Sequence, residues 1–188
     1  MQQLYDVLFV SSNKNKYQEA SAILAEFGIK LGFFNCKLSE IQSDSIRKIA
    51  SHKAIYAFSQ CKKPVIVEDD GLFIDSLSRF PGPFSSYVFK TIGNKGILQL
   101  VNTKRNANFQ SVIAYCDKKQ VVLFAAKVTG KVSKKIHGKG WGYDPIFIPH
   151  GQKMTYSLLK NKNELSHRYL ALRKFAKWFV RRQQSIYL

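Results

Sequence analysis

Residues 65–71 read Val-Ile-Val-Glu-Asp-Asp-Gly. The run from Val65 to Val67 is typical of a short buried strand, and Glu68, Asp69 and Asp70 follow it directly. Neighbouring carboxylates repel one another and raise each other's pKa unless a cation or fixed donors offset their charge. Because Mg2+ prefers carboxylate ligands, the pattern predicts a strand that ends in metal ligands at the lip of a sheet. A solvated polar loop is the alternative interpretation.

The overall charge of the chain is strongly positive. Among 188 residues, 30 are Lys or Arg and 12 are Asp or Glu, which gives a net charge of +18. Such a surplus attracts polyanions, which include nucleic acids, anionic membranes and small phosphorylated substrates. The length suits one domain with a proper core, and the hydrophobic share of 45% is ordinary for a globular protein.

Targeting and redox features are few. The apolar run from Leu4 to Val10 is too short for a signal peptide and contains Asp6, and no apolar stretch approaches the roughly 20 residues of a membrane span. Cys36, Cys61 and Cys116 form no CxxC pair, so we interpret them as reduced thiols. We therefore expect a cytoplasmic protein without a membrane partner.

Hydrophobic periodicity predicts alternating strands and helices. Polar turns separate them, and neither a repeat nor a linker is visible. The pattern indicates one compact α/β unit. The predicted strands are 4–10, 31–34, 64–67, 109–116 and 121–128, and the predicted helices are 14–27, 45–61, 96–101 and 166–182.

A polar loop joins the first strand to the first helix. It reads Ser11-Ser12-Asn13-Lys14-Asn15-Lys16, and free N–H groups at a helix start can bind phosphate oxygens. Lys16 adds a mobile positive charge. The loop lacks the glycines of a Walker A motif, so an ordinary capped helix with exposed lysines is the alternative.

Two further segments carry unusual residues. Gly140-Trp141-Gly142-Tyr143-Asp144-Pro145 holds aromatic rings on a glycine-rich turn, where a ring can stack on a purine base. Ser166-His167-Arg168 opens the last helix, where basic side chains oppose the helix dipole unless an electron-rich ligand binds them. Core packing of the rings and simple exposure of the basic residues are the alternatives.

Together with Glu40, Lys53, Pro81-Gly82-Pro83 and Lys162, these segments resemble the inosine triphosphate pyrophosphatase family over nearly the whole chain. The resemblance implies an α/β fold with an elongated mixed β-sheet flanked by helices. It also implies that residues 1–188 form a single domain with two lobes around a central substrate cleft, and that the protein is a homodimer. The implied reaction is the Mg2+-dependent hydrolysis of a non-standard purine nucleoside triphosphate, such as ITP, dITP or XTP, to the monophosphate and pyrophosphate, which cleanses the nucleotide pool.

The resemblance also assigns roles to individual residues. Asp69 matches the catalytic carboxylate, which activates water and meets the metal. Glu40 and Glu68 match further metal-binding positions. The substrate-binding positions that it implies are Ser11, Ser12, Asn13, Lys14, Asn15, Lys16, Lys53, Asp70, Trp141, Gly142, Tyr143, Asp144, Lys162, His167 and Arg168.

Three positions depart from the family pattern. The loop usually begins Thr-Gly, whereas Ser12 brings a side chain to a place where close phosphate approach favours glycine. Trp141 replaces a smaller phenylalanine. Asp70 stands where many members have serine, which leaves its contact with the substrate open.

Two other functions compete with this one. A nucleic-acid-binding protein would explain the charge of +18, but it gives no reason for clustered carboxylates, so we expect no stable nucleic-acid partner. A related pyrophosphatase that acts on other modified nucleotides is the second alternative. For purines, donors such as Arg168 would bind a 6-keto oxygen and reject the 6-amino group of adenine.

Overall fold

The computed structural model describes residues 5–184. The chain alternates strands and helices in its first third, and two long strands and a long last helix dominate the remainder. The strands are β1 (Val7–Ser11), β2 (Leu31–Asn35), β3 (Val65–Ile74), β4 (Asn106–Cys116), β5 (Val121–Val132) and β6 (Phe147–Pro149). The α-helices are α1 (Lys14–Ala25), α2 (Ile46–Cys61), α3 (Ser85–Thr91), α4 (Gly93–Leu100), α5 (Lys162–Leu165) and α6 (His167–Gln184).

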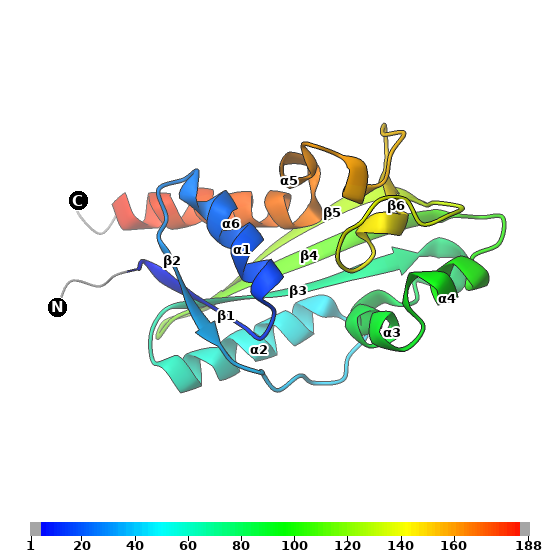
Figure 1. Cartoon of the computed structure of the whole chain (residues 1–188). Coiled ribbons are helices and arrows are strands. Elements are labelled where there is room, and N and C mark those ends of the chain that lie inside the picture. Colours follow the sequence, from blue (N-terminus) through cyan, green and yellow to red (C-terminus); the bar gives the residue numbers. More distant parts are fainter. Residues whose placement is uncertain (1–4, 185–188) are drawn as a thin grey trace.

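The strands form one mixed sheet of six strands in the order β2-β1-β3-β4-β5-β6. β1 pairs in parallel with β2 and β3, and the remaining pairs are antiparallel. In Figure 1, α1 and α6 lie over one face of the sheet and α2 lies over the other. The predicted α/β fold, a mixed sheet flanked by helices, is confirmed. The single domain with two lobes stays a prediction.

Two apolar clusters fix the two faces of the sheet. Ile66 packs in a cluster with residues of α1 and α6, such as Ile23 and Phe175. Its neighbours Val65 and Val67 pack in another cluster with residues of α2. Side chains therefore alternate between the two faces along β3, as the pleat of a strand requires.

The acidic residues lie inside β3 and not at its end. The predicted strand end at Val67 is wrong, because β3 continues through the acids to Ile74 and pairs with β4 over its whole length. Glu68 lies opposite Ile113, Asp69 opposite Val112 and Asp70 opposite Ser111. The alternation then sends Glu68 and Asp70 toward α6 and Asp69 toward α2.

Local signals set the helix starts. The Asn13 side chain accepts hydrogen bonds from the backbone N–H groups of Asn15 and Lys16, and Ser166 Oγ accepts one from Tyr169 N at 3.1 Å. Gly71 allows β3 to lie close to the turn that follows it, because a side chain there would collide with the carbonyl oxygen of Gly82. Leu4, in the first predicted strand, lies outside the described residues.

Among the described helices, none combines the length and the apolar character that a membrane span requires.

Candidate active site

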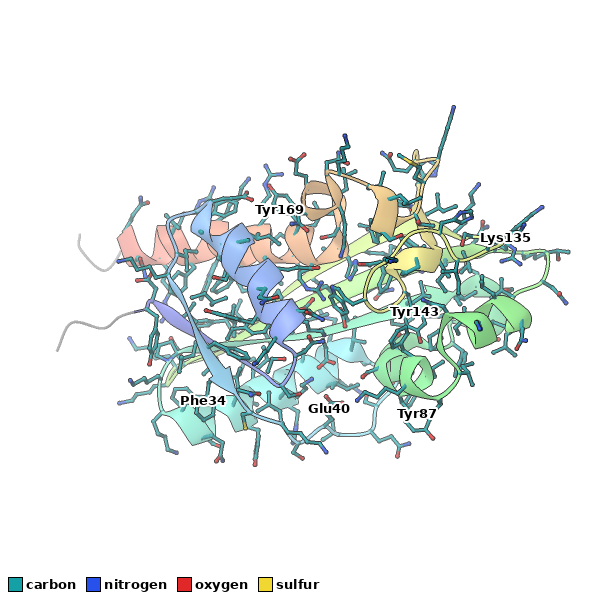
Figure 2. The ribbon with its side chains drawn as sticks, in the orientation of Figure 1. Phe34, Glu40, Tyr87, Lys135, Tyr143 and Tyr169 are labelled. Atoms are coloured by element: carbon teal, nitrogen blue, oxygen red, sulfur yellow. The ribbon has the colours of Figure 1, made fainter. Side chains whose placement is uncertain are left out.

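A cavity of about 790 Å³ lies over the acidic part of β3. Its walls come from the loop before α1, the segment before α2, α3, and the segment that contains Trp141. Glu40, Tyr87 and Tyr143, which Figure 2 labels, all line it although they are far apart in the sequence. The fold thus brings most of the predicted site residues to one cavity.

Arg168 organises the α6 side of β3. Its guanidinium contacts the carboxylates of Glu19, Glu68 and Asp70 at 2.5, 2.8 and 2.7 Å, and its side chain is 1% exposed. Burial would lower the pKa of Arg168, but these carboxylates raise it further above its ordinary value. Arg168 is therefore a permanent cation that holds three acids together.

Lys16 completes this side. Its Nζ donates a hydrogen bond to Asp70 Oδ1 at 2.7 Å and lies 4.0 Å from Glu68. Burial would raise the pKa of Asp70, but Lys16 and Arg168 hold that pKa well below its ordinary value. Asp70 is thus an ionised, doubly paired carboxylate.

Glu68 is fully enclosed. Its side chain is 0% exposed, its Oε2 accepts from Arg168, and its Oε1 accepts from the Ser111 hydroxyl at 2.9 Å. Both of its oxygens therefore have protein partners. A metal-binding role of Glu68 stays a prediction that would require these bonds to exchange.

Asp69 has a different environment on the α2 side. Lys53 Nζ donates to Glu40 Oε1 at 2.8 Å and lies 3.2 Å from Asp69 Oδ2, which is buried and has no well-aligned hydrogen bond within residues 5–184. Burial raises the pKa of Asp69 to about 6, because Lys53 and Lys16 only partly offset it and Glu40 adds a like charge. Asp69 is therefore an undercompensated carboxylate at the cavity wall.

The predicted phosphate loop forms one rim of the cavity. Ser11, Ser12, Asn13 and Asn15 line it together with Lys16, whereas exposed Lys14 is not among the lining residues. The backbone N–H groups of Asn15 and Lys16 at the start of α1 donate to the Asn13 side chain, so a phosphate would have to take the place of this cap. A phosphate-binding role of this loop stays a prediction.

The predicted base-binding segment closes the other end. Trp141 Nε1 donates to Glu19 at 3.0 Å, and the Arg168 guanidinium lies 4.9 Å from the centre of the Trp141 ring. Lys162 bridges Glu19 and Asp144 at 3.1 and 2.6 Å. Gly142 also lines the cavity.

Tyr143 is 4% exposed and its hydroxyl donates a hydrogen bond to the backbone oxygen of Ser85, so Tyr143 packs in the core as well as lining the cavity.

His167 is a second group in the cavity wall with unused hydrogen-bonding capacity. It is 3% exposed, and both of its ring nitrogens lack a hydrogen-bond partner among the described residues. Its ring stacks on Phe109 at 4.2 Å between centroids, and its Nε2 lies 3.8 Å from Asp70, beyond hydrogen-bond distance. A buried orphan imidazole that lines a cavity is costly unless a ligand completes its bonds.

The acids do not converge as a metal cage. Within residues 5–184, no group of three or more His, Cys, Asp or Glu residues is arranged to hold a metal ion. The carboxylates of Glu40 and Asp69 both contact Lys53. The orphaned Oδ2 of Asp69 fits a hard cation that takes few protein ligands and completes its coordination from phosphate and water.

Sequence reasoning missed three residues of the site. Glu19 lies one helical turn after Lys16, and this spacing of three residues could have placed it on the same side of α1. Ser111 and Phe109, which hold Glu68 and His167, lie in a strand whose pairing with β3 had no local signal.

The chain is similar to known proteins in sequence and in fold. A sequence model of the Ham1 family matches residues 7–178. A dITP/XTP pyrophosphatase of Methanopyrus kandleri is 45% identical, with 92% of this chain and 95% of the relative covered. One of Korarchaeum cryptofilum is 40% identical, with 93% and 96% covered. The structure of a HAM1 protein from Coxiella burnetii has a TM-score of 0.81 and 26% identity, with 94% of this chain and 100% of that chain covered.

Proposed function

The chain belongs to the Ham1 family, and we propose that it hydrolyses ITP, dITP and XTP to the nucleoside monophosphate and pyrophosphate. The names of its relatives support the reaction and the substrate class. The observation that carries the proposal is the position of Asp69, an undercompensated carboxylate in a cavity whose rim includes lysines and the start of α1.

The charge balance of the cavity supports a metal requirement. Carboxylates and cationic side chains are equal in number along its walls, so the cavity offers no surplus of positive charge to a nucleoside triphosphate with about four negative charges unless cations come with it. The carboxylates that line it are Glu40, Glu68, Asp69, Asp70 and Asp144, and the cations are Lys16, Lys37, Lys53, Lys90 and Arg168.

Glu40 and Asp69 are the residues that would hold this metal, and Mg2+ is the ion we propose. When bound, it would neutralise phosphate charge and hold the triphosphate in place. Lys53 contacts both carboxylates, so a cation that took its place would leave its ammonium group free to contact a phosphate.

Asp69 is the proposed catalytic residue. Its buried Oδ2 lacks a well-aligned donor within residues 5–184, so it can accept a proton or a hydrogen bond from a water molecule. A water oriented in this way would attack the α-phosphorus, and pyrophosphate would leave. Lys16 and Lys53 would offset the charge that develops on the phosphates.

The base-binding end would select 6-keto purines. The Arg168 nitrogens already donate to three carboxylates, so we assign the contact with the base to His167. A His167 N–H can donate to a 6-keto oxygen, whereas the 6-amino group of adenine would face it donor to donor. Trp141 would stack on the base.

A nucleotide panel tests this function. ITP, dITP, XTP, GTP and ATP are each incubated with and without Mg2+, and pyrophosphate and orthophosphate are measured separately. We expect pyrophosphate from the first three substrates only when Mg2+ is present. Orthophosphate as the first product, or equal rates with ATP and ITP, would contradict the proposal.

We also propose that the enzyme acts in the cytoplasm as a homodimer, as the family resemblance implies. Sedimentation analysis of the full chain tests the dimer.

A further inference from the structure

Asp70 lies at the junction of the two ends of the cavity. Its Oδ1 accepts from Lys16 at 2.7 Å, and its Oδ2 accepts from Arg168 at 2.7 Å. Its side chain is 18% exposed. Both oxygens thus serve protein cations, one beside the phosphate loop and one beside Trp141.

We propose that Asp70 is a positioning residue: it is an internal counter-ion that occupies Lys16 in the free enzyme and is exchanged for a phosphate of the substrate. By competing for Lys16, Asp70 weakens the binding of the triphosphate. This inference rests on the proposed function, because it names the regulation of the same site.

The contacts of the two cations differ in a way that supports the exchange. Arg168 keeps Glu68 and Glu19 as partners whether or not Asp70 is charged. Lys16 has Asp70 at hydrogen-bond distance, and Glu68 is farther away at 4.0 Å. Neutralising Asp70 would therefore release Lys16 while Arg168 stayed in place.

A direct role of Asp70 in holding phosphate is physically unfavourable. Its carboxylate is held between two cationic side chains, and it would repel a polyanion that came within a few ångströms. After Lys16 turned to a phosphate, Asp70 would still have Arg168 as its partner, so no buried charge would be stranded. The exchange consequently costs one ion pair and gains another.

The test measures binding without turnover. The probe is an ITP analogue with a methylene group between the α- and β-phosphorus atoms, bound in the presence of Mg2+ and followed by calorimetry. We expect Asp70→Asn to lower its Kd about fivefold, since one like charge near the phosphates is removed. With ITP as substrate, KM should fall by a larger factor than kcat changes.

Asp117→Asn is the matched control. Asp117 is also a carboxylate held by an arginine, Arg182 at 2.6 Å, but it lies outside the residues that line the active-site cavity. The control changes the net charge equally and also loses an ion pair, so its Kd should equal that of the wild type. If Asp117→Asn lowered the Kd as much as Asp70→Asn does, the change in net charge would account for the effect, and the proposal would be overturned.

A double-mutant cycle with Lys16→Met isolates the pair. In that background Asp70→Asn should no longer tighten binding, because the released cation is gone. A Kd that is unchanged or raised in Asp70→Asn, with Asp70→Ser as a second folded variant, would contradict the inference. Failure of the proposed function would look different: the wild type would release no pyrophosphate from ITP, whatever the variants bind.

Discussion

The two sides of β3 give their acidic residues different environments. On the α6 side, Glu68 and Asp70 are paired with Arg168 and Lys16, and both oxygens of each carboxylate have partners. On the α2 side, Asp69 lies near Lys53, which also contacts Glu40, and the Oδ2 atom of Asp69 has no well-aligned donor within residues 5–184. These residues are adjacent in the sequence.

The pleat of β3 produces this difference. Successive side chains point to opposite faces, so three consecutive acids cannot share one environment. The saturated side stabilises the fold and holds the cavity together, whereas the unsaturated side retains the capacity to bind a cation or activate water. The acid that we propose to be catalytic is therefore the one whose charge is least well compensated.

Asp69→Asn should have the largest effect on activity. We expect turnover of ITP to fall by about three to four orders of magnitude, because the group that orients water is lost. Stability without metal should stay equal or rise, since an undercompensated buried charge disappears. Steady-state kinetics and thermal unfolding measure the two effects, and near-normal turnover would remove Asp69 from its role.

Glu68→Gln should mainly damage the fold. Removing one member of a buried ion pair leaves Arg168 with less compensation, and we expect a loss of about 3–5 kcal/mol in the free energy of unfolding. Urea denaturation measures it. A stable Glu68→Gln protein that needed more Mg2+ for activity would instead favour Glu68 as a metal ligand. The α6 side of β3 would then also bind metal, and the contrast between the two sides would fail.

Glu19→Gln should change the acid stability of the protein. Burial opposes ionisation, yet Arg168 and Lys162 lower the pKa of Glu19 to about 2 from an ordinary value of 4.5. A lowered carboxyl pKa stabilises the fold above the unfolded pKa, and that stability is lost as the pH falls from about 4.5 to about 2. The variant should lose about 2–3 kcal/mol at pH 7 and show a flatter profile in this window.

Urea titrations at several pH values between 2 and 7 make this measurement. Profiles of equal slope for the wild type and Glu19→Gln would mean that Glu19 is not ion-paired in solution.

Glu40→Gln should have the smallest effect. Its side chain is 61% exposed, so we expect stability close to that of the wild type. The Mg2+ concentration for half-maximal activity should rise about tenfold, because one oxygen ligand loses its charge. A metal titration of ITP hydrolysis checks this, and an unchanged titration would leave Asp69 as the sole protein ligand.

Much of the fold could be predicted from the sequence because its signals are local. Asn13 and Ser166 cap helices through hydrogen bonds to residues two or three positions away. The helical spacing of apolar residues predicted α1, α2 and α6. The end of β3 was mispredicted for the opposite reason. Polar residues in a strand interior need distant partners, and Ser111 and Arg168 are 43 and 100 residues from Glu68.

The site residues also divide into those with a local sequence signal and those that depend on distant partners. Lys16, Lys53, Trp141 and His167 belong to segments with recognisable patterns, and the structure brings them to one cavity. Glu19 looks like a solvated helical acid until α6 and Trp141 are placed beside it. The unequal environments of the acids in β3 depend on the register with β4, which no short motif encodes.

Hydrolysis of ITP in water enriched in oxygen-18 tests most directly whether water attacks at the α-phosphorus. Mass spectrometry of the two products shows which phosphorus atom received the oxygen. We predict that the label appears in inosine monophosphate and that pyrophosphate stays unlabelled. Label in pyrophosphate would show attack at the β-phosphorus and would contradict the proposed position of the water.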